Sequence, residues 1–236
     1  MKFIISSFWS AQMDGLAHHT WSSFDAYAAR HGYEAQAGVH APGADIMWDR
    51  PRQWARVLAS VPDGTLVLFV GIDVFVTRPD RPITDWVDDE HDAFVLVDHG
   101  HVFGDAHIWR ATSATRKLMA DVGARSTPLA ARCTTEQESI MINLSGMSMT
   151  DFTQYCLKAG GFGTPEFYKA AQFGLSPTIR TKVLNLQGFC GDDPANWWGN
   201  IPPHHQWSPH HLMLHLGGMS VERRIEYLHA FKKNAG

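Results

Sequence analysis

The sequence has few cysteines, few charges and no long apolar run. Its 236 residues include three cysteines, Cys133, Cys156 and Cys190, which are too few and too scattered for a disulfide framework or a cysteine-based zinc site. Their odd number also points to a reducing compartment. No stretch of about 18 apolar residues occurs, so we expect no membrane span.

The sequence also has no large excess of positive or negative charge. Charged residues make up 19% of the chain and the formal net charge is −4, so no basic field favours nucleic acid or an anionic membrane as a partner. The apolar run in residues 1–12 is too short for a signal peptide and predicts a first strand instead. We therefore expect a cytoplasmic enzyme or binding protein.

Apolar periodicity predicts alternating strands and helices. Strands are expected at 2–8, 34–43, 65–76, 91–100, 181–186 and 212–218, and helices at 16–33, 49–61, 113–124, 134–144 and 220–234. Gly32 and Gly123 would end their helices, Asp49 would cap the second helix, and Thr134 or Thr135 would cap the fourth. The order β-α-β-α-β predicts a single α/β domain on a mostly parallel sheet flanked by helices.

One carboxylate stands out in "VLFVGIDVFVTRP", where Asp73 interrupts an apolar run. A buried carboxylate is costly unless it binds a metal or a donor, and ligands of open α/β sheets bind at the carboxyl ends of strands. His215 in "LMLHLGG" is a candidate second ligand at another strand end. The alternatives are that Asp73 is a cap or pairs with Arg78 or Arg81, and that His215 is a core histidine.

Four stretches resemble one enzyme family. They are "FDAYAARHGYEAQ", "WARVLASVPDGTLVLFVGIDVFV", "EQESIMINL" and "LMLHLGG". In this order they are similar to motifs of the fungal and plant galactosyl-, mannosyl- and xylosyltransferases, which have the Rossmann-like GT-A fold. The resemblance implies one domain over 1–236, with a nucleotide-sugar-binding half at 1–100. The acceptor-side half, at 101–236, would end in a strand that bears a metal ligand.

The sequence departs from the family at several positions. The family's Asp-x-Asp motif reads Gly71, Ile72 and Asp73, so the first carboxylate is missing. Arg56 stands where the helix motif has lysine, and Ser220 stands at a usually basic position, so that Arg223 or Arg224 would have to meet the phosphates. The family's Asn-x-Gly segment is not recognisable in residues 99–112, although Arg110 falls where an arginine is expected.

The resemblance implies roles for the donor side of the site. Asp73 and His215 would bind a divalent cation, Mn²⁺ or Mg²⁺, beside the diphosphate of a nucleotide-sugar donor, with a UDP-sugar favoured. The other donor-binding candidates are Arg56, Gly71, Ile72, Gly217, Gly218 and Arg223, and Ser6, Phe8 and Trp9 at the nucleobase. Ser6, Phe8 and Trp9 could equally be ordinary core residues.

Catalytic candidates lie further along the chain. Glu136 and Gln137 would face the transferred sugar, although Glu136 could instead lie in a solvated first turn of a helix capped through Glu138. Asp98 or Asp105 would act as the acceptor-side base, or both would be loop caps.

The loop at 196–211, "NWWGNIPPHHQWSPHH", is rich in tryptophan and histidine and predicts a lid or acceptor wall. A separate zinc site on its histidines is a minor alternative.

Three functions compete. The first is metal-assisted transfer of a sugar to a hydroxyl acceptor, with retention of configuration implied by the resemblance. The acceptor would be a glycan or another hydroxyl compound, with a nucleic-acid acceptor such as a hydroxylated nucleobase less favoured. The others are a non-catalytic relative that binds a sugar nucleotide or glycan, and a His-rich metal-dependent hydrolase. With no membrane anchor expected, a microbial or viral setting fits a transferase better than a Golgi one.

Overall fold

The computed structural model describes residues 2–40, 45–98, 101–177, 179–184, 189–192 and 206–235. The strands are β1 Phe3–Ser10, β2 Glu34–His40, β3 Leu66–Val70, β4 Val74–Val76, β5 Ala93–Asp98, β6 His101–Arg110, β7 Thr181–Leu184, β8 Cys190–Asp192 and β9 Met213–His215. The helices are α1 Asp14–His31, α2 Ile46–Ser60, α3 Ser113–Ala124, α4 Glu136–Ser145, α5 Met149–Ala159, α6 Pro165–Gly174 and α7 Val221–Ala235.

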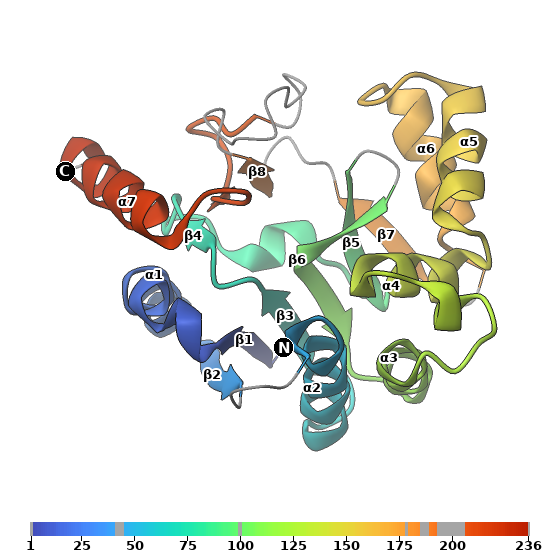
Figure 1. Ribbon diagram of the computed structural model, residues 1–236, viewed down its shortest axis with the longest axis horizontal. Helices are drawn as coiled ribbons and strands as arrows, with labels where there is room; N and C mark the ends of the chain where they lie inside the picture. The colour runs from blue at the N-terminus through green and yellow to red at the C-terminus, as the bar shows by residue number, and fades with distance from the viewer. Residues whose placement is uncertain are drawn as a thin grey trace.

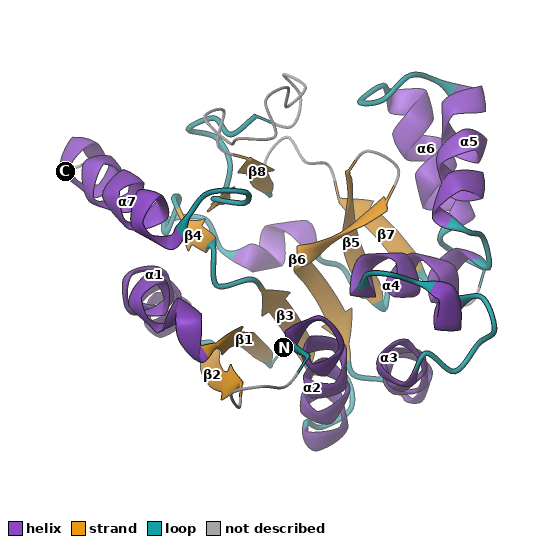
Figure 2. Ribbon diagram, in the orientation of Figure 1, coloured by secondary structure: helices purple, strands orange, loops and turns teal. Residues whose placement is uncertain are grey.

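Six strands form the central sheet in the order β2-β1-β3-β6-β5-β7 (Figures 1 and 2). Neighbours pair in parallel except at β6, which runs antiparallel to both β3 and β5. This confirms the expected α/β fold with a mainly parallel central sheet flanked by helices.

The sheet is covered on both faces because its inner strands are apolar on both sides. On β3, Val67 and Phe69 pack with residues of α2, α3 and α4, including Trp54 and Ile140. Leu68 and the other alternate residues of β3 pack on the opposite face with α1. Successive side chains of a strand point to opposite faces, so the continuous apolar run of β3 requires both layers of helices.

A second sheet contains β4, β9 and β8 in that order. Strand β9 pairs antiparallel with β4, and Val74 lies opposite His215. The register therefore brings the residue after Asp73 against a strand that lies about 140 residues further along the chain.

One expected strand is interrupted, and one strand of the main sheet was not predicted. The expected strand at 65–76 ends at Val70, turns through residues 71–73, and resumes as β4 in the second sheet. Residues 101–110, for which no strand was expected, form β6 in the middle of the main sheet. Polar residues and Gly104 interrupt the apolar pattern of β6, which is why its sequence does not look like a central strand.

The helix ends show a mixed outcome. Gly32 ends α1 with a φ of 69°, as expected, and Thr135 caps α4 in a capping box with Glu138. Helix α2 begins earlier than expected, because Asp45 and not Asp49 accepts the capping hydrogen bond from Met47. Helix α3 continues through Gly123 to Ala124, and Arg125 caps its end.

No helix in these ranges combines the length and apolar character needed to cross a membrane.

Candidate functional site

The turn between β3 and β4 positions Asp73. Gly71 donates a backbone hydrogen bond to the carbonyl of Asp105 on β6, with an N···O distance of 2.9 Å. The carbonyl of Asp73 accepts one from Leu216, just after β9, at 2.8 Å. These two bonds fix the turn between two strands that are distant in the sequence.

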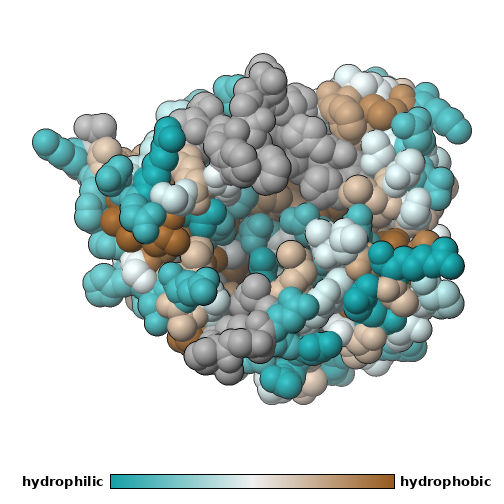
Figure 3. Space-filling model, viewed as in Figure 1, coloured by the Kyte–Doolittle hydropathy of each residue, from teal (hydrophilic) through white to brown (hydrophobic). Residues whose placement is uncertain are grey.

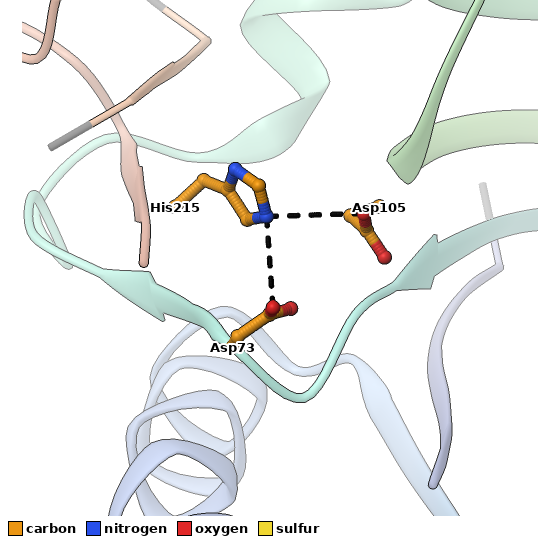
Figure 4. Close-up of side chains that lie close together, drawn as sticks. All are labelled: Asp73, Asp105 and His215. Carbon is orange, nitrogen blue, oxygen red and sulfur yellow. Dashed lines mark ion pairs between the residues drawn. The ribbon is translucent and has the colours of Figure 1, made fainter. Parts of the chain in front are cut away.

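Three side chains converge at this turn, one each from the turn, β6 and β9 (Figure 4). Nε2 of His215 lies 3.7 Å from Oδ2 of Asp73 and 3.8 Å from Oδ2 of Asp105. One ligand atom from each residue lies within 4.8 Å of the other two. The ring of Phe103 packs edge-on against the imidazole, with 4.9 Å between ring centroids.

Two arginines balance the negative charge. Arg50 on α2 donates to Oδ1 of Asp105 at 2.7 Å and to the carbonyl of Gly104 at 3.1 Å. Arg224 on α7 approaches Oδ2 of Asp73 to 3.4 Å. Both guanidinium groups are largely buried, so each adds positive charge in a place where water screens it weakly.

Glu136 and Gln137 open α4 beside the same cluster. Glu136 is only 3% exposed and its Oε1 lies 3.4 Å from Nη1 of Arg50. The capping box of Thr135 and Glu138 is also present, so the first turn is capped while Glu136 points inward. Gln137 lies against Gly104: a Cβ added to Gly104 would come within 2.7 Å of Cγ of Gln137.

The ionisation of two carboxyls reflects this setting. Burial opposes ionisation of Asp73, but His215, Arg224 and Arg50 outweigh it and hold the pKa of this carboxyl well below its usual range. Burial raises the pKa of Glu136, and Arg50 opposes that rise while Asp105 adds to it. The cluster therefore contains one carboxyl held ionised and one with an increased tendency to carry a proton.

Two glycines leave room for these side chains. A Cβ on Gly71 would lie 2.5 Å from Oδ1 of Asp105 and 2.8 Å from Oδ1 of Asp73. A Cβ on Gly217 would lie 2.2 Å from Cε1 of His215. Gly218 has a φ of 74°, a backbone conformation that favours glycine.

The site lies at a hollow in the surface. Figure 3 shows the face hollowed near its centre, in the region where Figure 1 shows the end of β3 beside β6, and hydrophilic side chains lie in the hollow. Ile72, 7% exposed, packs beneath the turn in an apolar cluster with Trp9 and Leu216.

The nucleobase candidates occupy β1. Ser6 is 6% exposed, and Phe8 lies against Gly38 of the neighbouring β2. The indole of Trp9 donates to Oδ1 of Asp14 at 2.8 Å, and its ring packs with Trp21. These contacts account for Trp9 as a core residue.

The structure does not bring every predicted residue to the cluster. Arg56, six residues after Arg50 on α2, is exposed and donates to Gln53. Arg223 is exposed, whereas the adjacent Arg224 reaches Asp73. Asp98 ends β5, and its side chain lies outside the described part of the chain.

The predicted lid at 196–211 is described only from Gln206 onward, so His204 and His205 lie outside the described residues. Trp207 packs against Phe231 of α7, and His211 is buried with its Nδ1 accepting from the backbone N–H of Ser208. His210 is exposed. Among the described residues, three ligand side chains come close enough to share an ion at Asp73, and none of the three belongs to this segment.

Sequence reasoning missed Arg50, and it took Asp105 as an acceptor-side base or a loop cap and not as part of this cluster. The only sequence signal for Arg50 is its place one turn before Trp54 on the helix that precedes β3, and the cation–π contact between the two shows that they share a face. The place of Asp105 in the cluster has no local signal, because its partners come from the turn after β3, from β9 and from α2.

The cluster fits a divalent cation. Two carboxylate oxygens and one imidazole nitrogen form a donor set that Mn²⁺ and Mg²⁺ accept, and their spacing allows one ion to be shared. The missing Cβ atoms at Gly71 and Gly217 keep the ligand atoms accessible. The two arginines beside the cluster could bind a diphosphate that such an ion also contacts.

No model of a protein family matches the chain, and no curated protein matches it. Among solved structures, it resembles a glycosyltransferase involved in the glycosylation of the major capsid of PBCV-1, with 15% identity, a TM-score of 0.61, and 96% of this chain and 99% of that chain covered. The galactosyltransferase LgtC shows 11% identity and a TM-score of 0.42, with 97% and 95% covered. The glycosyltransferase GlyE of Streptococcus pneumoniae TIGR4 shows 12% identity and a TM-score of 0.41, with 100% and 64% covered. The first of these likenesses shows that the chain has a GT-A-type glycosyltransferase fold.

Proposed function

We propose that this protein is a metal-assisted glycosyltransferase that moves a sugar from a nucleotide-diphosphate sugar to a hydroxyl acceptor. The observation that carries the proposal is the convergence of Asp73 and His215, with 3.7 Å between Oδ2 and Nε2, inside a glycosyltransferase fold. Both residues are the metal ligands that the family resemblance implies.

Asp73 and His215 would hold the cation, Mn²⁺ or Mg²⁺. When bound, this ion neutralises negative charge on the departing nucleoside diphosphate. Arg224, which already lies at Asp73, supports binding of the diphosphate from α7. Backbone at Gly71, Ile72, Gly217 and Gly218 comes close to the phosphates because the glycines lack side chains.

Glu136 and Gln137 would contact the transferred sugar from the start of α4. Glu136 is buried against Arg50, which holds its carboxyl in a fixed orientation. In this position it would orient a sugar hydroxyl or stabilise positive charge that develops at the anomeric carbon. Ser6 and Phe8 on β1 would contact the nucleobase, with a UDP-sugar favoured and retention of configuration taken from the family.

The acceptor side of the proposal rests on the second half of the chain, 101–236. A glycan or another hydroxyl compound is favoured over a nucleic acid because the chain has no basic excess. The cytoplasmic, microbial or viral setting stays a prediction. The absence of a carboxylate at Gly71 is the one feature that favours the alternative of a non-catalytic sugar-nucleotide-binding relative.

The test is a donor screen with UDP- and GDP-sugars, in which release of the nucleotide is measured with Mn²⁺ and with a chelator. We expect release from at least one donor that depends on the metal. Asp73→Asn should abolish this release, whereas Asp80→Asn, which removes an exposed carboxylate elsewhere, should leave it intact.

Three other results would contradict the proposal. Binding of a nucleotide sugar without any turnover would favour the non-catalytic relative. Tight zinc binding with no nucleotide binding would favour the hydrolase. Full release by the Asp73→Asn variant would remove the metal role from this residue.

A further inference from the structure

Gly71 stands where the resemblance calls for the first carboxylate of an Asp-x-Asp motif, and another carboxylate fills the space beside it. A Cβ on Gly71 would lie 2.5 Å from Oδ1 and 3.0 Å from Cβ of Asp105. Both distances are shorter than a non-bonded contact allows. The first carboxylate is therefore missing from the motif while a carboxylate from β6 occupies the place where its side chain would begin.

Asp105 is held so that one of its oxygens faces the cluster. Its Oδ1 accepts a hydrogen bond from Arg50 at 2.7 Å, and its Oδ2 lies 3.8 Å from Nε2 of His215. Its backbone carbonyl accepts from Gly71 at 2.9 Å. The backbone and the side chain of Asp105 are thus both anchored. Its Oδ2 faces His215, where it can bind a cation that Asp73 and His215 share.

We propose that Asp105 supplies, from β6, the second carboxylate ligand that the Gly71-Ile72-Asp73 stretch lacks. The ligand set would then be restored by a residue 34 positions after Gly71, on a strand that runs antiparallel to β3. This assignment rests on the proposed function, because it concerns the same cation, and it replaces the expected role of Asp105 as an acceptor-side base.

The surroundings favour a ligand over a base. The carboxylates of Asp73 and Asp105 come within 4.8 Å of each other, a repulsion that a shared cation removes. A base needs an oxygen directed at the acceptor hydroxyl, but Oδ1 is taken by Arg50 and Oδ2 faces His215. Asp105 therefore lacks an oxygen for the acceptor in this arrangement.

The test moves the carboxylate from position 105 to position 71 by mutation. Mn²⁺ affinity is measured by calorimetric titration in the absence of donor. Asp105→Asn keeps the shape but removes the charge, and we expect it to weaken Mn²⁺ binding about 10- to 100-fold. Asp105→Gly should weaken Mn²⁺ binding by a similar factor. Adding Gly71→Asp to Asp105→Gly should bring the affinity back to within a few-fold of wild type, because the motif carboxylate then has the space that Asp105 had filled.

Controls separate this proposal from the proposed function. Asp80→Asn should bind Mn²⁺ like wild type, and thermal melting should show that each variant is folded. Wild-type affinity in Asp105→Asn, together with lost binding in Asp73→Asn, would overturn the role of Asp105 and leave the metal site in place. Wild-type Mn²⁺ affinity and donor hydrolysis in Asp105→Asn, with transfer to acceptor lost, would return Asp105 to the role of base. No Mn²⁺ or Mg²⁺ binding by wild type would overturn both proposals.

Discussion

Arg224 places Nη2 3.4 Å from Oδ2 of Asp73, whereas Arg223, its neighbour on α7, is exposed. Consecutive residues of a helix point about 100° apart, so only one of two adjacent arginines can face the turn between β3 and β4. The sequence "SVERRIE" offers both. The packing of α7 makes Arg224, and not Arg223, the arginine that reaches Asp73.

This relationship predicts different results for the two arginines. Arg224→Gln should weaken binding of UDP in the presence of Mn²⁺ about 10-fold or more, because a hydrogen bond to a charged group contributes about 1.5–3 kcal/mol. Arg223→Gln should stay within about twofold of wild type, the range expected for an exposed charge. Isothermal titration calorimetry measures both, and equal losses in the two variants would contradict the assignment.

Arg50 should matter for folding as well as for binding. Arg50→Gln leaves Asp105 and Glu136 buried without their shared cation, so we expect the free energy of unfolding to fall by about 3 kcal/mol. Arg56→Gln, on the exposed side of the same helix, should change it by less than about 0.5 kcal/mol. Urea denaturation followed by circular dichroism provides the comparison. A loss below about 1 kcal/mol in Arg50→Gln would show that the pairing is not needed for stability.

Gly217 should be intolerant of any side chain. The Cβ of Gly217→Ala would overlap the ring of His215, so the imidazole would have to move away from Asp73 and Asp105. We expect Mn²⁺ affinity to fall about 10-fold or more, the size of effect seen when ligand orientation is disturbed. Gly161→Ala is the matched control because an added Cβ there meets nothing within 4 Å. Unchanged Mn²⁺ affinity in Gly217→Ala would contradict the ring position.

A pH-dependent contribution to stability is expected at Asp88, which belongs to an ion-pair network outside the cluster. Burial alone would raise the pKa of Asp88, but hydrogen bonds from Lys182 and His91 outweigh it and lower this pKa below its usual range. A carboxyl with a lowered pKa in the folded state stabilises the fold above its unfolded pKa, and that contribution disappears as the pH falls through the folded value.

Asp88→Asn should therefore cost about 1 kcal/mol of unfolding free energy at pH 7, since the pairs are partly exposed. The difference between variant and wild type should shrink as the pH falls below about 4, where the unfolded carboxyl takes up its proton. Urea denaturation at pH 7, 5 and 3 measures the trend. A difference that stays constant across this range would show that Asp88 contributes through shape and not through charge.

Much of the fold could be predicted from local patterns. The apolar runs of β1 and β3, the spacing of α1 and the capping box at Thr135 each depend on residues close in sequence. The prediction failed at β6, where polar residues occupy a central strand. It also failed at the end of β3, because nothing local shows that the chain changes sheets at Gly71.

In the candidate site, too, some residues could be identified from the sequence and others only from the tertiary structure. Asp73 and His215 could be selected from the sequence because each lies at the end of an apolar strand and each matches a motif. Arg50 could not be selected. The place of Asp105 in the cluster and the choice of Arg224 over Arg223 could not be decided either, because both depend on which residues face them. Asp105 looks like a loop residue until β6 is paired with β3, and Arg50 looks like a solvated helix residue until α2 packs on the sheet.

The sequence by itself determined that this chain forms layered α/β structure and that Asp73 and His215 are the residues to examine. Hydrophobic periodicity and helix capping act over a few residues, so they can be recognised in the chain alone. Only the tertiary structure decided that Asp105 fills the place beside Gly71 and that Arg50 and Arg224 provide the positive charge. Those contacts join residues 34 to about 150 positions apart, and the register between distant strands and the packing of α2 and α7 set them.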